Sequence, residues 1–234
     1  MRNMFQFSHL RGKILFYFLT ISVVALLVAF GIVYYQVSLN IRLQETEKLI
    51  AVRNLKTNRL LSWLDERKGD IRVVANDNQI RAMEFLFFEQ ETPADQREEI
   101  FTFARNHLQS YLKNFADYHE ILIIHPETGR IVLSTLEERE GIDVSDRPYF
   151  HILNQPEQVL VHQIRYSEYL SRNTLDFSVP IYCEEHQGEH IIGILVARTN
   201  PDASLYPLLG DTVGLGESGE TMIVDQEGVV QNPL

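Results

Sequence analysis

The sequence predicts an α+β fold. We expect a transmembrane helix that continues into a long stalk helix, then a five-stranded antiparallel sheet and the start of a second unit. Three observations predict this order. An uncharged apolar run lies near the N-terminus of the 234-residue chain. No proline interrupts the helical pattern that follows, up to Pro93. From Tyr118 onward, short β-rich segments alternate with turns that contain Gly or Pro.

The composition excludes some classes of function. With 45% hydrophobic and 23% charged residues, the chain has the apolar content of a folded protein. Its formal net charge of −11 argues against a nucleic-acid partner, which would require a basic face to neutralise phosphates. Cys183 is the only cysteine. An internal disulfide and a zinc site made of several thiolates are therefore excluded.

Residues 14–35 form the first predicted element, a membrane-spanning helix. Their sequence, ILFYFLTISVVALLVAFGIVYY, contains no charged residue and has aromatic residues towards both ends. As a helix it spans about 33 Å, which matches a hydrocarbon core of roughly 30 Å. The alternatives are a buried core helix and a cleavable signal peptide. The apolar region of a signal peptide would be only about 7–15 residues long, and no A-x-A cleavage site follows this run.

The charge on either side of this helix predicts its orientation. Residues 1–13 carry three basic side chains and no acidic one, a local charge of +3, so the remainder carries −11 − 3 = −14. Basic flanks stay in the cytoplasm by the positive-inside rule. We therefore expect a cytoplasmic N-terminus in the bacterial inner membrane, with the chain from about residue 36 outside the cytoplasm.

Residues 36–90 are predicted to contain the stalk helix and a connection. The helix should run without a break from the membrane to about Asn76, a length on the order of 90 Å. Apolar residues recur along it at spacings of three and four or their sums, which indicates one apolar stripe. The stripe can pack against the chain's own sheet or against a second copy, and we expect a homodimer through this helix. Its members are Leu49, Val52, Leu60, Trp63, Leu64, Ile71 and Val74.

Residues 91–200 are predicted to form the first α+β unit. A helix should start at Thr92 as N-cap and Pro93 as first helical residue, and run to about Phe115. A short helix is expected at about Pro148–Leu153 in the loop after the first two strands. The five strand candidates are Tyr118–His125, Arg130–Thr135, Val159–Tyr166, Thr174–Glu184 and His190–Arg198.

Residues 201–234 are predicted to begin a second unit. Pro201–Leu209 can form a short helix, and Glu220–Asp225 with Val229–Gln231 repeat the hairpin pattern of the first two strands. A hairpin that stops there would leave an open sheet edge. We therefore expect the sequence to be the N-terminal part of a longer protein.

Several motifs that can carry chemistry have a simpler interpretation here. Gly214–Gly219 spells G-x-G-x-x-G, but it does not connect a strand to a helix as a dinucleotide site requires. His125, His186 and His190 fall in predicted turns without a second ligand at metal-binding spacing. No G-x-S-x-G elbow occurs, and Cys183 lies in an apolar strand. We predict no catalytic residue, no metal site and no cofactor.

Residues 146–150, with the sequence D-R-P-Y-F, contain the strongest candidate for ligand binding. An Arg147 guanidinium at a helix start can hold a carboxylate through two hydrogen bonds. Tyr149 can close over the ligand and donate its hydroxyl, while Phe150 would face the core. The alternative is a local ion pair of Arg147 with Asp146 or Asp143 on a solvated loop.

In this order of elements the chain resembles the double Cache (dCache) extracytoplasmic sensor domains of bacterial receptors, whose lobes are PAS-like. The likeness covers about residues 14–234 and is most specific at Ser145–Phe150, Ile191–Ala197 and Gly216–Asp225. It implies a complete membrane-distal ligand-binding lobe and the start of a membrane-proximal one. It also implies a second transmembrane helix and a cytoplasmic output domain beyond Leu234.

The resemblance implies that Arg147 and Tyr149 line the ligand pocket with the strands that follow them. The polar candidates on those strands are Tyr166, Asp176 and Ser178. Asp176 and Ser178 alternate with apolar residues and therefore share the face opposite the core. An Asp near an Arg could receive the ammonium of an amino acid whose carboxylate the Arg holds.

Two positions depart from the amino-acid-binding version of this family. Ile142 stands where that motif has an aromatic residue, and Arg198 stands where it has an acid. Both departures favour an organic acid over an α-amino acid as the ligand.

We therefore predict the ligand-sensing input region of a membrane-bound signalling receptor, most often a sensor histidine kinase in proteins of this layout. A diguanylate cyclase or a methyl-accepting chemoreceptor is the alternative output. A membrane-anchored extracytoplasmic enzyme would need a metal or nucleophile cluster. A protein-interaction module would expose Arg147 and Tyr149 and would have no polar cavity beside them.

Overall fold

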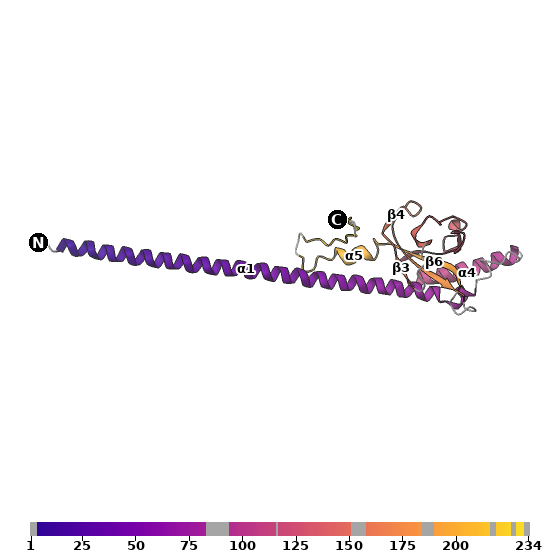
Figure 1. Cartoon of the computed structure of the whole chain (residues 1–234), viewed down its shortest axis with the longest axis horizontal. Helices are drawn as coiled ribbons and strands as arrows, with labels where there is room; N and C mark the ends of the chain where they lie inside the picture. The colour runs from indigo at the N-terminus through magenta and orange to yellow at the C-terminus, as the bar shows by residue number, and fades with distance from the viewer. Residues whose placement is uncertain are drawn as a thin grey trace. The chain divides into compact units, whose positions relative to one another are not determined.

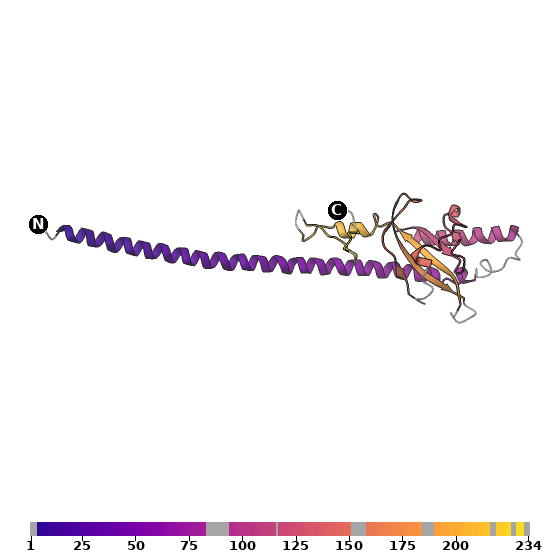
Figure 2. The ribbon, with the colours of Figure 1, turned by 45° about the horizontal axis from the view of Figure 1, so that its top comes forward.

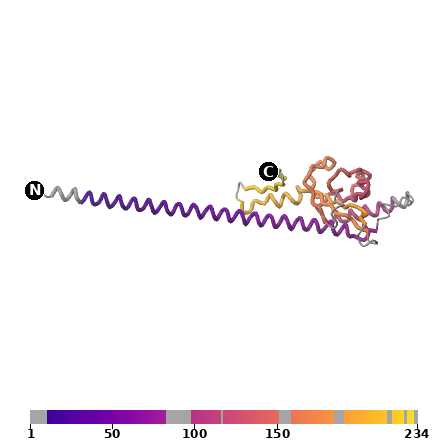
Figure 3. The backbone as a smooth tube through the Cα atoms, viewed as in Figure 1, coloured from indigo at the N-terminus to yellow at the C-terminus, as the bar shows by residue number. Residues whose placement is uncertain are grey.

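The structure is a computed structural model, and it describes residues 4–82, 94–115, 117–150, 158–183, 190–215, 219–225 and 228–231 (Figure 3). The chain divides into two compact units, Met1–Asn54 and Leu55–Leu234.

One helix, α1 (Met4–Ala75), runs through the first unit and into the second. This confirms the prediction of an unbroken helix that ends near Asn76. Within the first unit its apolar residues 14–35 are largely exposed, as a surface that faces lipid would be. An 18-residue window of this helix has a mean hydropathy of 2.6, so α1 is long and apolar enough to cross a membrane.

Within the second unit, the predicted stripe on α1 packs against the sheet. Trp63, Ile71 and Val74 are buried, and Leu60 and Leu64 pack against them. Farther towards the N-terminus, Leu49 belongs to the first unit and is exposed. Only the second half of the stripe therefore contributes to the core.

Among the described residues, two further helices precede the sheet. Asp77 caps the short helix α2 (Asn78–Arg81), because its carboxylate accepts hydrogen bonds from the backbone N–H groups of Gln79 and Ile80. The next helix, α4 (Ala94–Asn114), ends one residue before the predicted position. The predicted cap at Thr92 and Pro93 lies outside the described residues.

The sheet is antiparallel and has the strand order β2-β1-β6-β5-β3, with β4 also paired to β5. The 3-10 helix η1 (Glu137–Arg139) follows β2. The strands are β1 (Tyr118–Ile124), β2 (Ile131–Ser134), β3 (Leu160–Val161), β4 (Arg165–Ser167), β5 (Arg172–Tyr182) and β6 (Ile191–Thr199).

The segment predicted as a single strand, Val159–Tyr166, forms the two short strands β3 and β4. Val161 pairs with Phe177, so an unbroken ladder would pair Arg165 with Asn173. Arg165 pairs with Thr174 instead. The register therefore shifts by one residue between β3 and β4, and this shift interrupts the strand.

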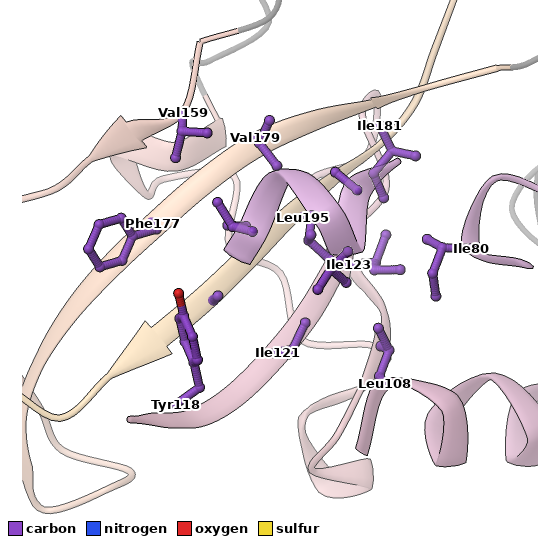
Figure 4. Packing of buried hydrophobic residues seen from close by; sticks show 14 of the residues in the cluster. Ile80, Leu108, Tyr118, Ile121, Ile123, Val159, Phe177, Val179, Ile181 and Leu195 are labelled. Atoms are coloured by element: carbon purple, nitrogen blue, oxygen red, sulfur yellow. The ribbon is translucent and has the colours of Figure 1, made fainter. Parts of the chain in front are cut away.

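The two faces of the sheet have different cores. On one face, α1 and α4 pack against alternate strand residues such as Ile121, Ile123 and Phe177 (Figures 1 and 4), and Leu205 and Leu209 of the last helix belong to the same cluster. On the other face, Leu122, Ile124 and their neighbours form a smaller cluster that includes Tyr149, from the loop between β2 and β3. Strand alternation thus separates a face covered by helices from a face covered by loops, and the candidate site lies on the second.

The chain leaves the sheet through α5 (Leu205–Gly210), which follows β6 (Figure 2). The Lys56 ammonium on α1 donates to the carbonyl oxygens of Leu209 and Asp211 and to Thr221 Oγ1. Beyond this point, Val224 and Val230 form an isolated antiparallel bridge, where the sequence predicts a second hairpin.

Candidate functional site

The sheet register places three charged residues in one row. Glu120 on β1 pairs with Arg198 on β6, and Arg198 pairs with Asp176 on β5. All three side chains are buried, on the face covered by loops. Because they come from three adjacent strands, only the folded sheet brings them together.

Arg198 is the centre of this row. Its Nη1 atom donates to Glu120 Oε2 at 2.8 Å, and its Nη2 atom donates to the Tyr149 hydroxyl at 3.2 Å. Its Nε atom lies 3.4 Å from Asp176 Oδ2. A second guanidinium, that of Arg139, lies with its Nε atom 3.4 Å from Glu120 Oε1. Two buried carboxylates thus balance two guanidiniums, which is the condition for burying such charges.

A cavity of about 400 Å³ lies above this cluster, within the second unit. Its volume falls in the range typical of small-molecule sites. Residues from η1, β4, β5, β6 and the loop before β3 line it. The charged lining residues are Arg139, Arg147, Arg165, Arg198, Asp143, Glu168 and Asp176.

Four of the five predicted ligand-binding residues line this one cavity: Arg147, Tyr149, Tyr166 and Asp176. The fifth, Ser178, does not belong to the lining. It is fully buried, and its Oγ atom shares a hydrogen bond of 2.7 Å with His162 Nε2. His162 in turn lies edge-on to the Tyr149 ring, so Ser178 supports the cavity wall indirectly.

Arg147 and Tyr149 occupy different environments although they are close in sequence. The Arg147 side chain is 52% exposed, and its Nε atom lies 3.6 Å from the Asp146 carboxylate. An ion pair this exposed is worth little in water, so the guanidinium can exchange it for a ligand. Tyr149 is only 1% exposed, and its burial raises the pKa of the phenol, which stays protonated at neutral pH.

The deep wall of the cavity contains an unused hydrogen-bond acceptor. Within the described part of the chain, Asp176 Oδ1 is buried and has no hydrogen-bond partner, although Oδ2 faces Arg198. The Arg165 side chain is half-buried, and its guanidinium makes no side-chain ion pair to any residue whose position is described. The cavity lining therefore combines guanidinium donors with a buried carboxylate.

Three basic residues of the cavity were missed as site residues by the sequence analysis. Arg198 was noted only as a departure from a motif, and Arg139 and Arg165 carried no signal. Strand alternation does predict that Arg198 shares a face with Asp176 once β5 and β6 are aligned. No local pattern predicts that η1 brings Arg139 to the same place.

Other candidates from the sequence have structural roles. His125 Nδ1 accepts hydrogen bonds from the backbone of Glu127 and Thr128, which makes it part of the β1–β2 turn. Cys183 is buried. His186 lies outside the described residues. Among those that are described, no group of three or more His, Cys, Asp or Glu side chains is placed to hold a metal ion.

Comparison with known proteins supports the fold. The Cache domain family model (dCache_1) matches residues 38–233. No curated protein sequence matches the chain.

The solved structures that resemble the chain come from several receptor classes. One is the ligand-binding domain of the Campylobacter jejuni chemoreceptor Tlp3 in complex with 4-methylisoleucine, with 16% identity, a TM-score of 0.57, and coverage of 76% of this chain and 65% of that one. The sensor domain of the V. cholerae histidine kinase DctB has 13% identity and a TM-score of 0.52, and the match covers 70% of this chain and 60% of that one. A domain of a sensory box/GGDEF family protein from Vibrio parahaemolyticus has 15% identity and a TM-score of 0.53, and the match covers 80% of this chain and 69% of that one. The chain thus spans less than two thirds of the length of the first two structures.

Proposed function

Because this chain belongs to the Cache domain family, whose members are extracytoplasmic sensors of membrane receptors, we propose that it senses a small carboxylate in the cavity of residues 55–234. Binding would shift the population between two arrangements of the domain, by the difference in the ligand's affinity for them. The α1 helix would carry this shift towards the membrane.

One observation carries the proposal. The cavity of about 400 Å³ is lined by Arg147, whose side chain is 52% exposed, and by the half-buried Arg165, and among the described residues neither guanidinium is held in a buried ion pair. Guanidinium groups bind carboxylates through paired hydrogen bonds, with better geometry than other cationic side chains. A protein-interaction module would expose both Arg147 and Tyr149 and have no polar cavity beside them. Arg147 is 52% exposed, but Tyr149 is buried and both residues line the cavity, which favours a ligand.

The membrane arrangement is part of the same proposal. Residues 14–35 would span the bacterial inner membrane, with the N-terminus in the cytoplasm and the sensing unit outside it. We further propose that two copies associate through α1. The mass of the detergent-solubilised chain in analytical ultracentrifugation tests this association, and a monomer would contradict it.

The output that we propose is a histidine kinase. Resemblance to the sensor domains of histidine kinases supports this choice. A chemoreceptor and a GGDEF protein are the alternatives, since both classes also contain structures that resemble the chain.

A thermal-unfolding screen tests the proposed function. The full chain in detergent would be heated with organic acids, amino acids, amines and purines, and unfolding would be followed by the fluorescence of Trp63, its only tryptophan. Trp63 is buried against Phe177, with ring centroids 6.1 Å apart, so its emission reports the core. A ligand at 100 times its Kd should add about 2.7 kcal/mol to the free energy of unfolding.

The variant Arg147→Gln identifies the site. We expect it to weaken carboxylate binding by about 10-fold or more, because a hydrogen bond between charged groups is lost. Arg53→Gln, on the exposed surface of α1, is the matched control and should bind as the parent chain does. A carboxylate that binds both variants equally would remove Arg147 from the site. A screen without any bound compound would contradict the sensor function itself.

A further inference from the structure

We propose that the cavity selects a hydroxycarboxylate, a carboxylate that carries a hydroxyl group near its acid group, in preference to the corresponding amino acid. This inference rests on the proposed function and narrows it to a ligand class. Three features of the cavity support it: an acceptor that lacks a partner, the charge of the groups around that acceptor, and the two arginines of the lining.

The first feature is the acceptor. Asp176 is 6% exposed and lines the cavity. Among the described residues, its Oδ1 atom has no hydrogen-bond donor. A buried polar atom without a partner is costly. A small side-chain shift in the cavity wall on binding would let a ligand bring a donor to this oxygen and gain affinity. Both a hydroxyl and an ammonium group could supply that donor.

The second feature, the charge, distinguishes these two groups. Asp176 Oδ2 already faces Arg198, and Glu120 lies between Arg198 and Arg139. These two acids and two guanidiniums make a neutral cluster beneath the cavity. An ammonium at Asp176 Oδ1 would add a third cation to it, at a depth where water screens charges poorly. A hydroxyl supplies the same hydrogen bond and leaves the cluster neutral.

The third feature fixes the orientation of the ligand. Arg147 and Arg165 line the same cavity, where the Arg147 side chain is 52% exposed and Arg165 is half-buried. Both therefore lie nearer to solvent than Asp176, which is buried. A carboxylate bound there would direct the adjacent carbon atoms inwards, towards Asp176. The ligand would therefore hold its acid group at the mouth and its hydroxyl group at the base.

The test uses matched ligands on the full chain in detergent, with binding measured by calorimetry. Each set keeps one carbon skeleton and changes only the group at carbon 2 from hydroxyl to amino to hydrogen. The sets are lactate, alanine and propionate; malate, aspartate and succinate; and 2-hydroxy-4-methylpentanoate, leucine and 4-methylpentanoate. In at least one set we expect the hydroxy acid to bind about 10-fold tighter than both of its partners.

The variant Asp176→Asn shows whether the preference arises at this residue. It keeps the size of the side chain, and its amide oxygen would face the Arg198 Nε donor, so an NH2 group would replace the acceptor at the Oδ1 position. The ratio of affinities for the hydroxy and unsubstituted acids should therefore fall towards one. Asp65→Asn, an exposed substitution on α1, should leave that ratio unchanged. The two affinities are measured on the same variant. A general loss of stability would weaken both of them and leave their ratio unchanged.

Each other outcome overturns the inference in a recognisable way. An amino acid that binds tightest would contradict the charge argument but leave the sensor function intact. Equal binding of hydroxy and unsubstituted acids would remove Asp176 from recognition. If no member of any set binds, the hydroxycarboxylate inference fails, and the broader screen then decides whether the sensor function fails with it.

Discussion

His162 illustrates how burial of one residue controls its protonation. The ring lies between Tyr149 and Ser178, and desolvation lowers its pKa, with Asp176 raising it and Arg165 lowering it further. In the unfolded chain the pKa returns to about 6.5. Below that pH the unfolded chain binds more protons than the folded one, so the folded state loses stability as the pH falls through 6.5.

This pKa shift predicts a pH-dependent stability that His162→Gln should reduce. Urea unfolding between pH 7.5 and pH 5 should show a falling free energy of unfolding in the parent chain and a shallower fall in the variant. In the variant, the free energy of unfolding should still fall somewhat with pH, because burial also lowers the pKa of His119. His190→Gln, at an exposed position, is the control. Parallel pH profiles for His162→Gln and the parent chain would contradict the prediction.

At the scale of elements, one lysine joins α1 to the segment that leaves the sheet. Lys56 is 8% exposed, and its ammonium donates to Leu209 O at 2.8 Å, to Thr221 Oγ1 at 2.7 Å, and to Asp211 O. One turn farther along α1, Arg59 forms an ion pair of 3.2 Å with the Asp211 carboxylate. These acceptors lie more than 150 residues away in sequence, so the contact closes a long stretch of chain.

Lys56→Met should loosen this junction. The methionine retains most of the apolar length but supplies no donor, which leaves buried acceptors unsatisfied at a cost of about 1–3 kcal/mol. We expect faster amide hydrogen exchange in residues 205–211 and a lower free energy of unfolding. Lys48→Met, at an exposed position of α1, should change neither quantity. Equal exchange rates in the two variants would show that Lys56 does not hold α5 in place.

At the scale of the whole molecule, the apolar N-terminal part of α1 requires a membrane or a partner. Its residues from Ile14 to Tyr35 expose large apolar side chains to an extent that water-soluble proteins avoid. The second unit, by contrast, has its own two-sided core and contains most of residues 38–233, which the Cache family model matches. Membrane fractionation should therefore distinguish the full chain from a chain that lacks the apolar N-terminal part.

We predict that the full chain stays in the membrane pellet after an alkaline carbonate wash. A variant that lacks residues 1–35 should appear in the supernatant and retain the buried emission of Trp63. Release of the full chain by carbonate would contradict a membrane-spanning helix. Aggregation of the shortened variant would show that the second unit depends on residues 1–35 for its solubility.

Local sequence patterns determined most of the elements of this protein. The uncharged run at residues 14–35, the uninterrupted helix to Ala75 and the strand alternation around Phe177 each depend on neighbouring residues alone. Helical and strand periodicities are properties of such short windows, so they could be predicted. Even the face shared by Asp176 and Ser178 followed from alternation along one strand.

Only the tertiary structure decided which charged residues meet. Register across β1, β6 and β5 aligns Glu120, Arg198 and Asp176, which are far apart in sequence, and η1 adds Arg139 to them. It also decided that β3 and β4 are separate strands, because the shift in register arises from pairing with β5. Strand pairing and burial are set by contacts between distant segments. A single sequence therefore predicts the residues that can bind a ligand, and the fold decides which of them share a cavity.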